Sequence, residues 1–245
     1  MTDQIRRAQA RSRTWQLLSL AFAHPVAELH PQFADGRFAQ AFESAIDEAL
    51  ETGLGTSPGE PAELPSARVP FQEFEAQYIT LFNTGPKGRP LVPLCAAGYS
   101  ALLDGEPPPS LLLRYVQFYR HFGLKIRTGG EESELPDHLT CQLECLAWLT
   151  HLETRSLAQG DSAKGYRQAQ HDFIDRLLGP HCAQFAPRLA RTVNERGYDP
   201  LFAALGKALD ASQRRELADL QSTIGDEVQP PQTQSAPALT QNLWG

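Results

Sequence analysis

The 245-residue sequence predicts an all-α fold, a single globular bundle of about eight helices. Apolar residues recur at helical spacing along most of the chain, as at Trp15, Leu18 and Phe22. No segment alternates polar and apolar residues with the period of two that a half-buried strand requires. The apolar share of 41% is enough for one sizeable core, so one domain is expected.

The helices follow from this periodicity and from the glycines and prolines that interrupt it. The predicted helices cover residues 4–23, 37–52, 70–82, 110–122, 136–159, 163–178, 181–196 and 200–222. Proline is favoured at the first helical position, which places a helix start near Pro70. Gly160, Gly197 and the pair Gly179–Pro180 are expected to end helices.

Three segments are predicted to be non-helical. Residues 53–65 form a linker rich in glycine and proline, and residues 83–109 form an irregular stretch long enough to suggest a functional loop. Residues 225–245 are rich in Gln, Pro, Ser and Thr, which indicates a flexible tail after a helical domain at residues 1–224.

Charge and hydropathy exclude several classes of protein. The formal net charge of −7 disfavours a nucleic-acid partner and favours a cationic protein partner. No apolar run reaches the roughly 20 residues that span a bilayer, and the N-terminal segment lacks a cleavage site, so we expect a cytoplasmic protein without stable membrane insertion. The four cysteines form no CxxC pair and are expected to be reduced thiols.

The common catalytic signatures are missing from the sequence. It contains no GxxxxGK[ST] phosphate loop, no HExxH zinc helix, no GxSxG elbow and no GxGxxG turn after a strand. We therefore expect no enzymatic activity, no catalytic residues and no cofactor or metal of its own.

The most unusual composition lies at the start of the helix predicted from residue 136. Glu131, Glu132 and Glu134 precede Pro136, and no Lys or Arg lies between Arg127 and Arg155. Pro136 suits a first helical turn, where the helix dipole would stabilise the carboxylate of the next residue.

Asp137 and His138 follow that proline and have two interpretations. One is structural, with Asp137 as a first-turn acid and His138 as a solvated side chain. The other is functional, with both residues presenting hydrogen-bond acceptors to a guanidinium group or a peptide backbone.

Two other interpretations of the same helix remain open. His138, Cys141 and Cys145 are spaced i, i+3 and i+7, on one helix face, and could bind zinc with a fourth ligand from elsewhere. Cysteines at this spacing are more often small core residues. An acid–base enzyme would use Asp137, His138 and Glu144, although Glu144 lies off the face of His138.

An aromatic stripe leads into the long irregular stretch. Phe74, Tyr78, Leu81 and Phe82 share a helix face. The stripe is either the core face of its helix or the wall of a hydrophobic groove for a partner segment, with Leu81 and Phe82 better placed for the groove.

Three stretches resemble the TorD/DmsD/NarJ family of molybdoenzyme maturation chaperones, over roughly residues 10–210. They are Tyr78–Phe82 followed by Gly85 and Pro86; Leu135-Pro136-Asp137-His138-Leu139 with Glu144; and Phe173–Leu177 with Pro180 and Phe185. The second is the most specific. The chain looks most similar to the branch that serves type II dimethyl sulfoxide reductases.

The chain also departs from the family pattern. Ala97 stands where the family commonly has a serine, so any hydrogen bond from that hydroxyl is missing. Arg176 replaces a late histidine, and His181 stands where an aromatic residue often follows.

The resemblance implies an all-α, TorD-like fold and the function of a cytoplasmic, system-specific chaperone. Its partner would be the apo catalytic subunit of a molybdenum-containing oxidoreductase, including the twin-arginine leader. Binding would assist cofactor insertion and delay export until the subunit has folded. The alternative is a zinc-binding or acidic protein-interaction module without leader recognition.

The resemblance also implies a binding site. An apolar groove near Leu81, Phe82 and Tyr99 would receive the hydrophobic segment of the leader. Asp137 and His138, with nearby acids, would face its arginines. Pro136, Tyr78 and Glu144 belong to the same motifs and complete the expected client-binding and leader-binding set.

Overall fold

A computed structural model describes residues 3–50, 63–125 and 134–226, and within these ranges the chain forms helices and no strands. The α-helices are α1 (Asp3–Phe22), α2 (His30–Ala34), α3 (Arg37–Leu50), α4 (Phe71–Tyr78), α5 (Pro108–His121), α6 (Leu139–Gln159), α7 (Lys164–Phe173), α8 (Gly179–Arg196) and α9 (Pro200–Asp226). The all-α prediction of about eight helices is therefore confirmed. None of the described helices is long and apolar enough to cross a membrane.

Some predicted segments fall outside the described residues. They include Glu131 and Glu132, the linker up to residue 62 and the tail from residue 227. The irregular stretch after α4 is described, and it contains two 3₁₀ turns, Ala96–Gly98 and Ser100–Leu102.

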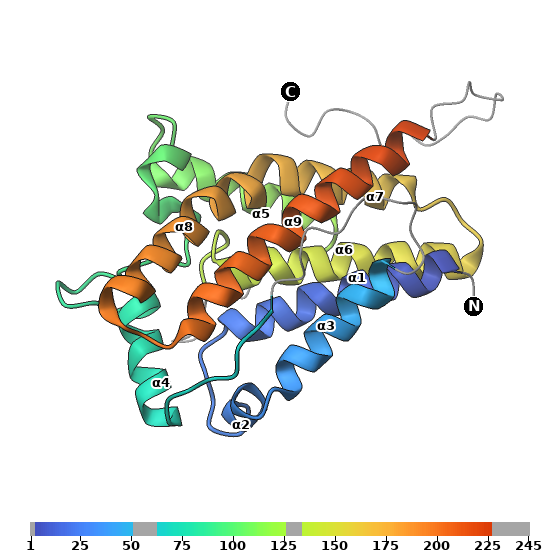
Figure 1. The fold of residues 1–245 in the computed structure, drawn as a ribbon. Helices are drawn as coiled ribbons and strands as arrows, with labels where there is room; N and C mark the ends of the chain where they lie inside the picture. Colours follow the sequence, from blue (N-terminus) through green and yellow to red (C-terminus); the bar gives the residue numbers. More distant parts are fainter. Residues whose placement is uncertain (1–2, 51–62, 126–133, 227–245) are drawn as a thin grey trace.

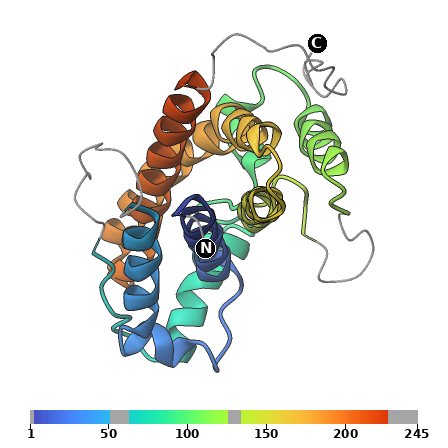
Figure 2. The same ribbon diagram turned by 90° about the vertical axis from the view of Figure 1, so that its right-hand side faces the viewer.

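Two pairings organise the bundle. The long helix α1 packs most extensively against α6, and α8 packs against α9 (Figure 1). Figure 2 looks nearly along α1 and α6 and shows them side by side at the centre, with α9 and α3 on one flank and α5 on the other. Large apolar side chains fill the interior between the helices, including Trp15 and Phe22 of α1, Phe173 of α7 and Phe185 of α8.

The predicted break at Gly179–Pro180 is wrong. Helix α7 passes through a π-helical turn, Ile174–Leu178, directly into α8, and Gly179 itself has helical backbone angles. A Cβ atom on Gly179 would lie 2.8 Å from the carbonyl oxygen of Ile174. The glycine therefore permits a close backbone approach at the wide turn, and Pro180 follows it inside the continuous helix.

The predicted glycine ends at Gly160 and Gly197 are confirmed. Both residues have positive φ, +78° and +63°, and follow the last turns of α6 and α8. Glycine adopts this left-handed conformation without the Cβ clash that other residues incur.

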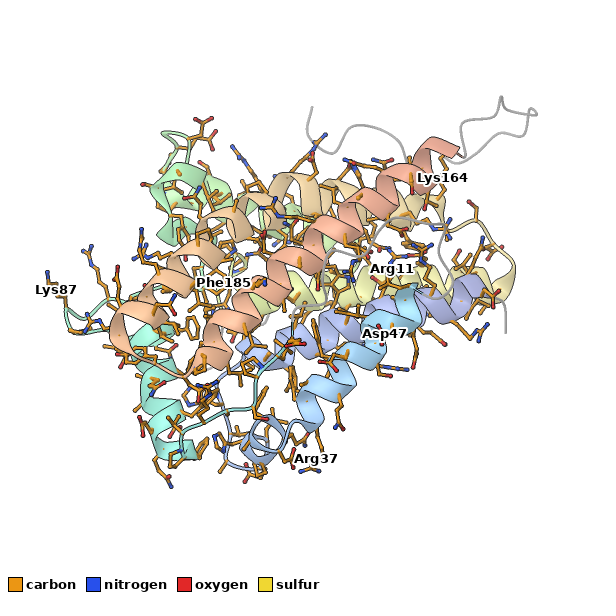
Figure 3. The ribbon with its side chains drawn as sticks, in the orientation of Figure 1. Arg11, Arg37, Asp47, Lys87, Lys164 and Phe185 are labelled. Atoms are coloured by element: carbon orange, nitrogen blue, oxygen red, sulfur yellow. The ribbon has the colours of Figure 1, made fainter. Side chains whose placement is uncertain are left out.

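A buried ionic network ties four helices together at the end of the bundle opposite α4. Arg11 on α1 donates to Glu153 on α6 and Glu216 on α9 and to Gln170 on α7, and Arg167 also donates to Glu153. Burial opposes the charge of Arg11, but the two glutamates raise its pKa above the ordinary value. Figure 3 shows Arg11 in the interior, well along the bundle from Phe185.

Candidate functional site

The start of α6 is held by the irregular stretch that follows α4. The backbones of Cys95 and His138 form an isolated antiparallel bridge. The N–H of Leu139 donates to the carbonyl of Leu94 at 2.8 Å, and the N–H of Ala96 donates to the carbonyl of Asp137 at 3.2 Å. Two segments about 40 residues apart in sequence thus form one backbone junction.

Asp137 seals this junction with its side chain. Its Oδ2 accepts a 2.7 Å hydrogen bond from the backbone N–H of Ala97, and the residue is 0% exposed. Burial raises the pKa of its carboxyl above the usual range, against the effect of the Ala97 N–H. This hydrogen bond comes from the backbone N–H of Ala97 and requires no side-chain hydroxyl at that position.

The predicted helix start at Pro136 is wrong. Helix α6 begins at Leu139, and His138 precedes it with extended backbone angles of φ −64° and ψ 139°. Asp137 consequently lies outside the first helical turn, because its side chain bonds to Ala97 and its carbonyl to Ala96. Its carboxylate serves the junction between segments, and no cap or first-turn role remains for it.

Gln142 and His181 lie directly beneath Asp137. The Nε2 of Gln142 donates to the carbonyl of Asp137 at 2.7 Å and lies 2.9 Å from Nδ1 of His181. Since an amide nitrogen is only a donor, Nδ1 of His181 must accept, which places the imidazole hydrogen on Nε2. Burial lowers the pKa of His181 to about 3, so the ring is neutral at physiological pH.

The accessible part of the site lies around His138. Its Nδ1 lies 3.0 Å from Oε2 of Glu134 and 2.7 Å from Oγ1 of Thr140, which in turn donates to Glu134. The hydrogen bond from His138 lowers the pKa of Glu134. Glu144 is exposed, and partial burial together with Glu134 raises its pKa.

An apolar side chain stands beside these acids. Leu135 is 52% exposed and directly follows Glu134, whose side chain is 44% exposed. Pro136 behind it is half-buried, and its carbonyl accepts a 2.8 Å hydrogen bond from the hydroxyl of Tyr119. Accessible carboxylates and an accessible leucine therefore share one surface at the start of α6, which we call the α6 patch (Glu134, Leu135, His138 and Glu144).

The predicted groove residues are buried. Tyr78 donates its hydroxyl to the carbonyl of Phe22 at 2.9 Å, and Leu81 and Phe82 pack in the core. Tyr99 donates to the carbonyl of Pro93 at 2.9 Å. Tyr78, Leu81 and Phe82 fill the interior and form no open groove wall in this structure. Tyr99 is buried as well, except where its ring lines a cleft beside α8. The role of all four in leader binding stays a prediction.

Phe185 lies between the aromatic stripe (Phe74, Tyr78, Leu81 and Phe82) and the residues at the α6 junction. Its ring lies 6.2 Å from that of Phe82 and 6.0 Å from that of His181, measured between centroids, and His181 lies 5.4 Å from Tyr99. The aromatic stripe and the α6 junction therefore share one interior cluster.

The zinc interpretation does not survive the geometry. Cys145 is buried in the core, whereas Cys141 is half-buried at the surface near Glu134. Within the described part of the chain, no three His, Cys, Asp or Glu side chains are grouped to hold a metal ion. Asp137 is completely buried whereas Glu144 is exposed, so the two carboxylates proposed for acid–base catalysis lie in different environments.

Sequence reasoning missed Gln142 and His181. They lie 39 residues apart, and their pairing carries no spacing signal. The replacement of an aromatic residue by His181 was the one visible hint, because a buried histidine requires a polar partner.

The family described as the nitrate reductase delta subunit matches this chain over residues 36–187. That range contains the complete α6 junction and the first half of α8. No solved structure matches the chain.

Two similar proteins align with nearly the whole chain, and a third aligns with more than half of it. The dimethyl sulfide dehydrogenase assembly chaperone protein of Rhodovulum sulfidophilum is 37% identical, with 99% of this chain and 95% of that protein covered. The perchlorate reductase assembly chaperone protein of Dechloromonas aromatica (strain RCB) is 29% identical, with 91% and 94% covered. The selenate reductase assembly chaperone protein of Thauera selenatis is 31% identical, with 59% and 70% covered.

Proposed function

Because the chain belongs to the nitrate reductase delta subunit family, we propose that it assembles the catalytic subunit of a molybdenum-containing oxidoreductase. Membership confirms the resemblance to the TorD/DmsD/NarJ chaperones. The chain is an assembly chaperone and not an enzyme, as the names of its relatives indicate. Its client belongs to the class that those names describe, reductases and dehydrogenases of small inorganic or sulfur compounds.

The chaperone acts in the cytoplasm on the apo form of the client and recognises its twin-arginine leader. It holds the leader while the cofactor is inserted and thereby delays export. Release follows when folding of the client makes the bound segment less available, which requires that the two client states differ in affinity for the chaperone.

We assign leader contact to the α6 patch. Glu134 and Glu144 are accessible carboxylates, and a guanidinium group forms strong, directional hydrogen bonds with such groups. The exposed Leu135 offers apolar contact to the hydrophobic residues that follow the leader arginines. The net charge of −7 adds long-range attraction for a cationic segment.

Asp137 and His138 have different roles in this proposal. His138 contacts the leader together with the acids, because its ring is partly accessible and fixed by Glu134. Asp137 positions the patch from within, since its hydrogen bond to Ala97 holds the turn that carries Leu135 and His138. Tyr78, Leu81, Phe82 and Tyr99 support the same junction through the interior cluster.

The buried carboxylate of Asp137 directly beneath an acidic, partly apolar surface is the observation that carries this assignment. Isothermal titration with twin-arginine leader peptides from molybdoenzymes of the same genome tests it. We expect one leader to bind near micromolar affinity, roughly −8 kcal/mol. Glu134→Gln with Glu144→Gln should weaken binding about tenfold or more, because two charge-assisted pairs are lost.

The control for that titration is Glu43→Gln, an exposed acid on α3. It removes the same type of charge away from the patch and should leave the affinity nearly unchanged. If no leader binds the wild-type protein, leader recognition fails, and a chaperone that holds only the mature client remains. Such a chaperone would bind the client equally well with and without its leader.

A further inference from the structure

A second polar surface lies on α8, opposite in charge to the α6 patch. A cleft of about 400 Å³ separates α8 from the second 3₁₀ turn. Its lining residues are Gly98, Tyr99, Ser100, Ala101, Ala183, Gln184, Pro187, Arg188 and Arg191. This lining carries two guanidinium groups and no carboxylate, although the whole chain has a net charge of −7. The cleft is therefore suited to an anionic group.

Arg188 is fixed in place before any ligand arrives. Its Nε donates to the carbonyl of Leu91 at 2.7 Å, and its guanidinium carbon lies 5.6 Å from the ring centroid of Tyr99. These contacts use Nε and one face of the Arg188 guanidinium. The two terminal nitrogens of Arg188 have no carboxylate partner among the described residues. A guanidinium held in this way binds a carboxylate with little loss of side-chain entropy.

Arg191 adds a second charge one turn further along α8. It is exposed and forms no ion pair within residues 3–50, 63–125 and 134–226. Two neighbouring cations without a bound counter-charge repel each other, so an incoming carboxylate gains from both.

Pro187 supplies a backbone acceptor at the same place. Proline has no N–H, so the carbonyl of Ala183, one turn earlier, lacks its regular intrahelical donor. Ala183 is exposed and lines the cleft. A polypeptide lying across α8 would donate a backbone N–H to this carbonyl.

An apolar groove continues from the cleft on the other side of Pro187. It runs between α8 and α9 and is lined by Ala186, Pro187, Ala190, Ala203, Ala204, Lys207 and Asp210. The alanines leave room for small apolar side chains, and Gly206 lets α9 approach Leu189 of α8 closely. A phosphate ion would gain nothing from the groove, whereas a polypeptide would use the cleft, the carbonyl and the groove together.

We infer that this α8 surface binds an acidic segment of the client that also carries small apolar side chains. The inference rests on the proposed chaperone function and assigns a second contact distinct from the leader. The arginines of a leader are repelled by Arg188 and Arg191, and an acidic segment is repelled by Glu134 and Glu144. The two surfaces therefore sort two parts of one client by charge.

The test is an NMR titration of the full-length, isotopically labelled protein with an acetylated, amidated peptide of four Glu-Ala repeats, and it measures chemical-shift changes. We expect shifts at the side-chain N–H groups of Arg188 and Arg191 and at the amides of Ala183 and Ala203. A peptide of four Gln-Ala repeats should cause far smaller shifts. Arg191→Glu should weaken binding of the Glu-Ala peptide about tenfold, since an attractive charge becomes repulsive.

The matched control is Arg155→Glu, an equal charge reversal at an exposed site on α6. It should leave the affinity for the Glu-Ala peptide close to that of the wild type. Equal weakening by both variants, or no shift at the α8 residues, would overturn the inference. Inorganic phosphate that shifts the arginines as strongly as the peptide, while the peptide leaves Ala203 unmoved, would reduce the cleft to a simple anion site and also overturn it.

The two proposals fail separately. If the Glu-Ala peptide binds but no leader does, leader recognition is wrong and the α8 surface stands. If a leader binds but the Glu-Ala peptide does not, the α8 assignment is wrong and the proposed function stands.

Discussion

The backbone N–H of Ala97 donates a 2.7 Å hydrogen bond to the carboxylate of Asp137, which lies 40 residues later in the chain and is completely buried. This bond joins the irregular stretch after α4 to the turn before α6. The bond thereby holds the turn that carries Glu134, Leu135 and His138 of the α6 patch.

Two substitutions of Asp137 distinguish the contribution of its hydrogen bond to stability from that of its charge. Asp137→Ala leaves the N–H of Ala97 without its acceptor and should lower the free energy of unfolding by about 1.5–3 kcal/mol. Asp137→Asn keeps an acceptor oxygen and, because burial already raises the pKa of the carboxyl, should cost clearly less. Urea unfolding of the three proteins measures both values. Equal losses for Asn and Ala would show that the charge, and not the acceptor, holds the junction.

His181 should make the protein sensitive to acid. Its folded pKa of about 3 lies below the unfolded value near 6.5, so protonation favours the unfolded chain throughout that interval. Its contribution to stability is constant above about pH 6.5 and falls by roughly 1.4 kcal/mol per pH unit below it. His181→Phe should be less stable at neutral pH, because Gln142 loses an acceptor, yet show a flatter pH dependence of the unfolding free energy between pH 6 and 4.

The control for the acid response is the exposed His121 on α5. His121→Phe should keep the pH dependence of the wild type. A slope that is the same in the His181 variant as in the wild type would contradict the buried neutral assignment.

Arg11 should matter far more than its exposed neighbour on the same helix. Arg11→Met leaves the buried carboxylates of Glu153 and Glu216 without their shared partner and should cost about 3–5 kcal/mol of stability. Arg13→Met removes an exposed pair with Glu48 and should cost under about 1 kcal/mol. Thermal unfolding of the two variants provides the comparison, and similar losses would refute a stabilising buried network.

Alanine substitution at two helical glycines should change the stability of the protein in opposite directions. Gly179→Ala places a Cβ 2.8 Å from the carbonyl oxygen of Ile174 and should destabilise the protein by about 1–3 kcal/mol. Gly165→Ala on α7 meets nothing within 4 Å and should stabilise it by up to about 1 kcal/mol, because alanine favours the helix. Chemical unfolding of both variants measures the two changes in the free energy of unfolding. Stabilisation by Gly179→Ala would mean that the π-helical turn is not tightly packed.

The sequence predicts most of the helices because their determinants are local. Apolar spacing marks the buried face of each helix, and Gly160 ends α6 by its own backbone preference. The break expected at Gly179–Pro180 fails because a π-helical turn and a helix end use the same residues, and only the contact with Ile174 distinguishes them.

The candidate site is less accessible to sequence reasoning because its contacts are distant in sequence. The position of Asp137 after Pro136 predicts a first-turn acid, whereas its carboxylate in fact bonds to the backbone N–H of Ala97. Leu81 and Phe82 have the same sequence pattern whether they line a groove or the core. The ring contacts of Phe82 with Phe22 and Phe185 and the complete burial of Leu81 place both in the core. The exposure of Leu135 beside Glu134 follows from the turn geometry, which no spacing encodes.

Site-specific photo-crosslinking at Leu135 tests the central claim most directly. A photoreactive phenylalanine derivative in place of Leu135, which is 52% exposed, should crosslink to the twin-arginine leader of the client. The same derivative in place of Val26, which is 49% exposed on the loop after α1, should not. Crosslinks from position 135 that map to the leader would support the α6 patch as the site of leader recognition. Crosslinks that map only to the mature client, or equally from both positions, would contradict it.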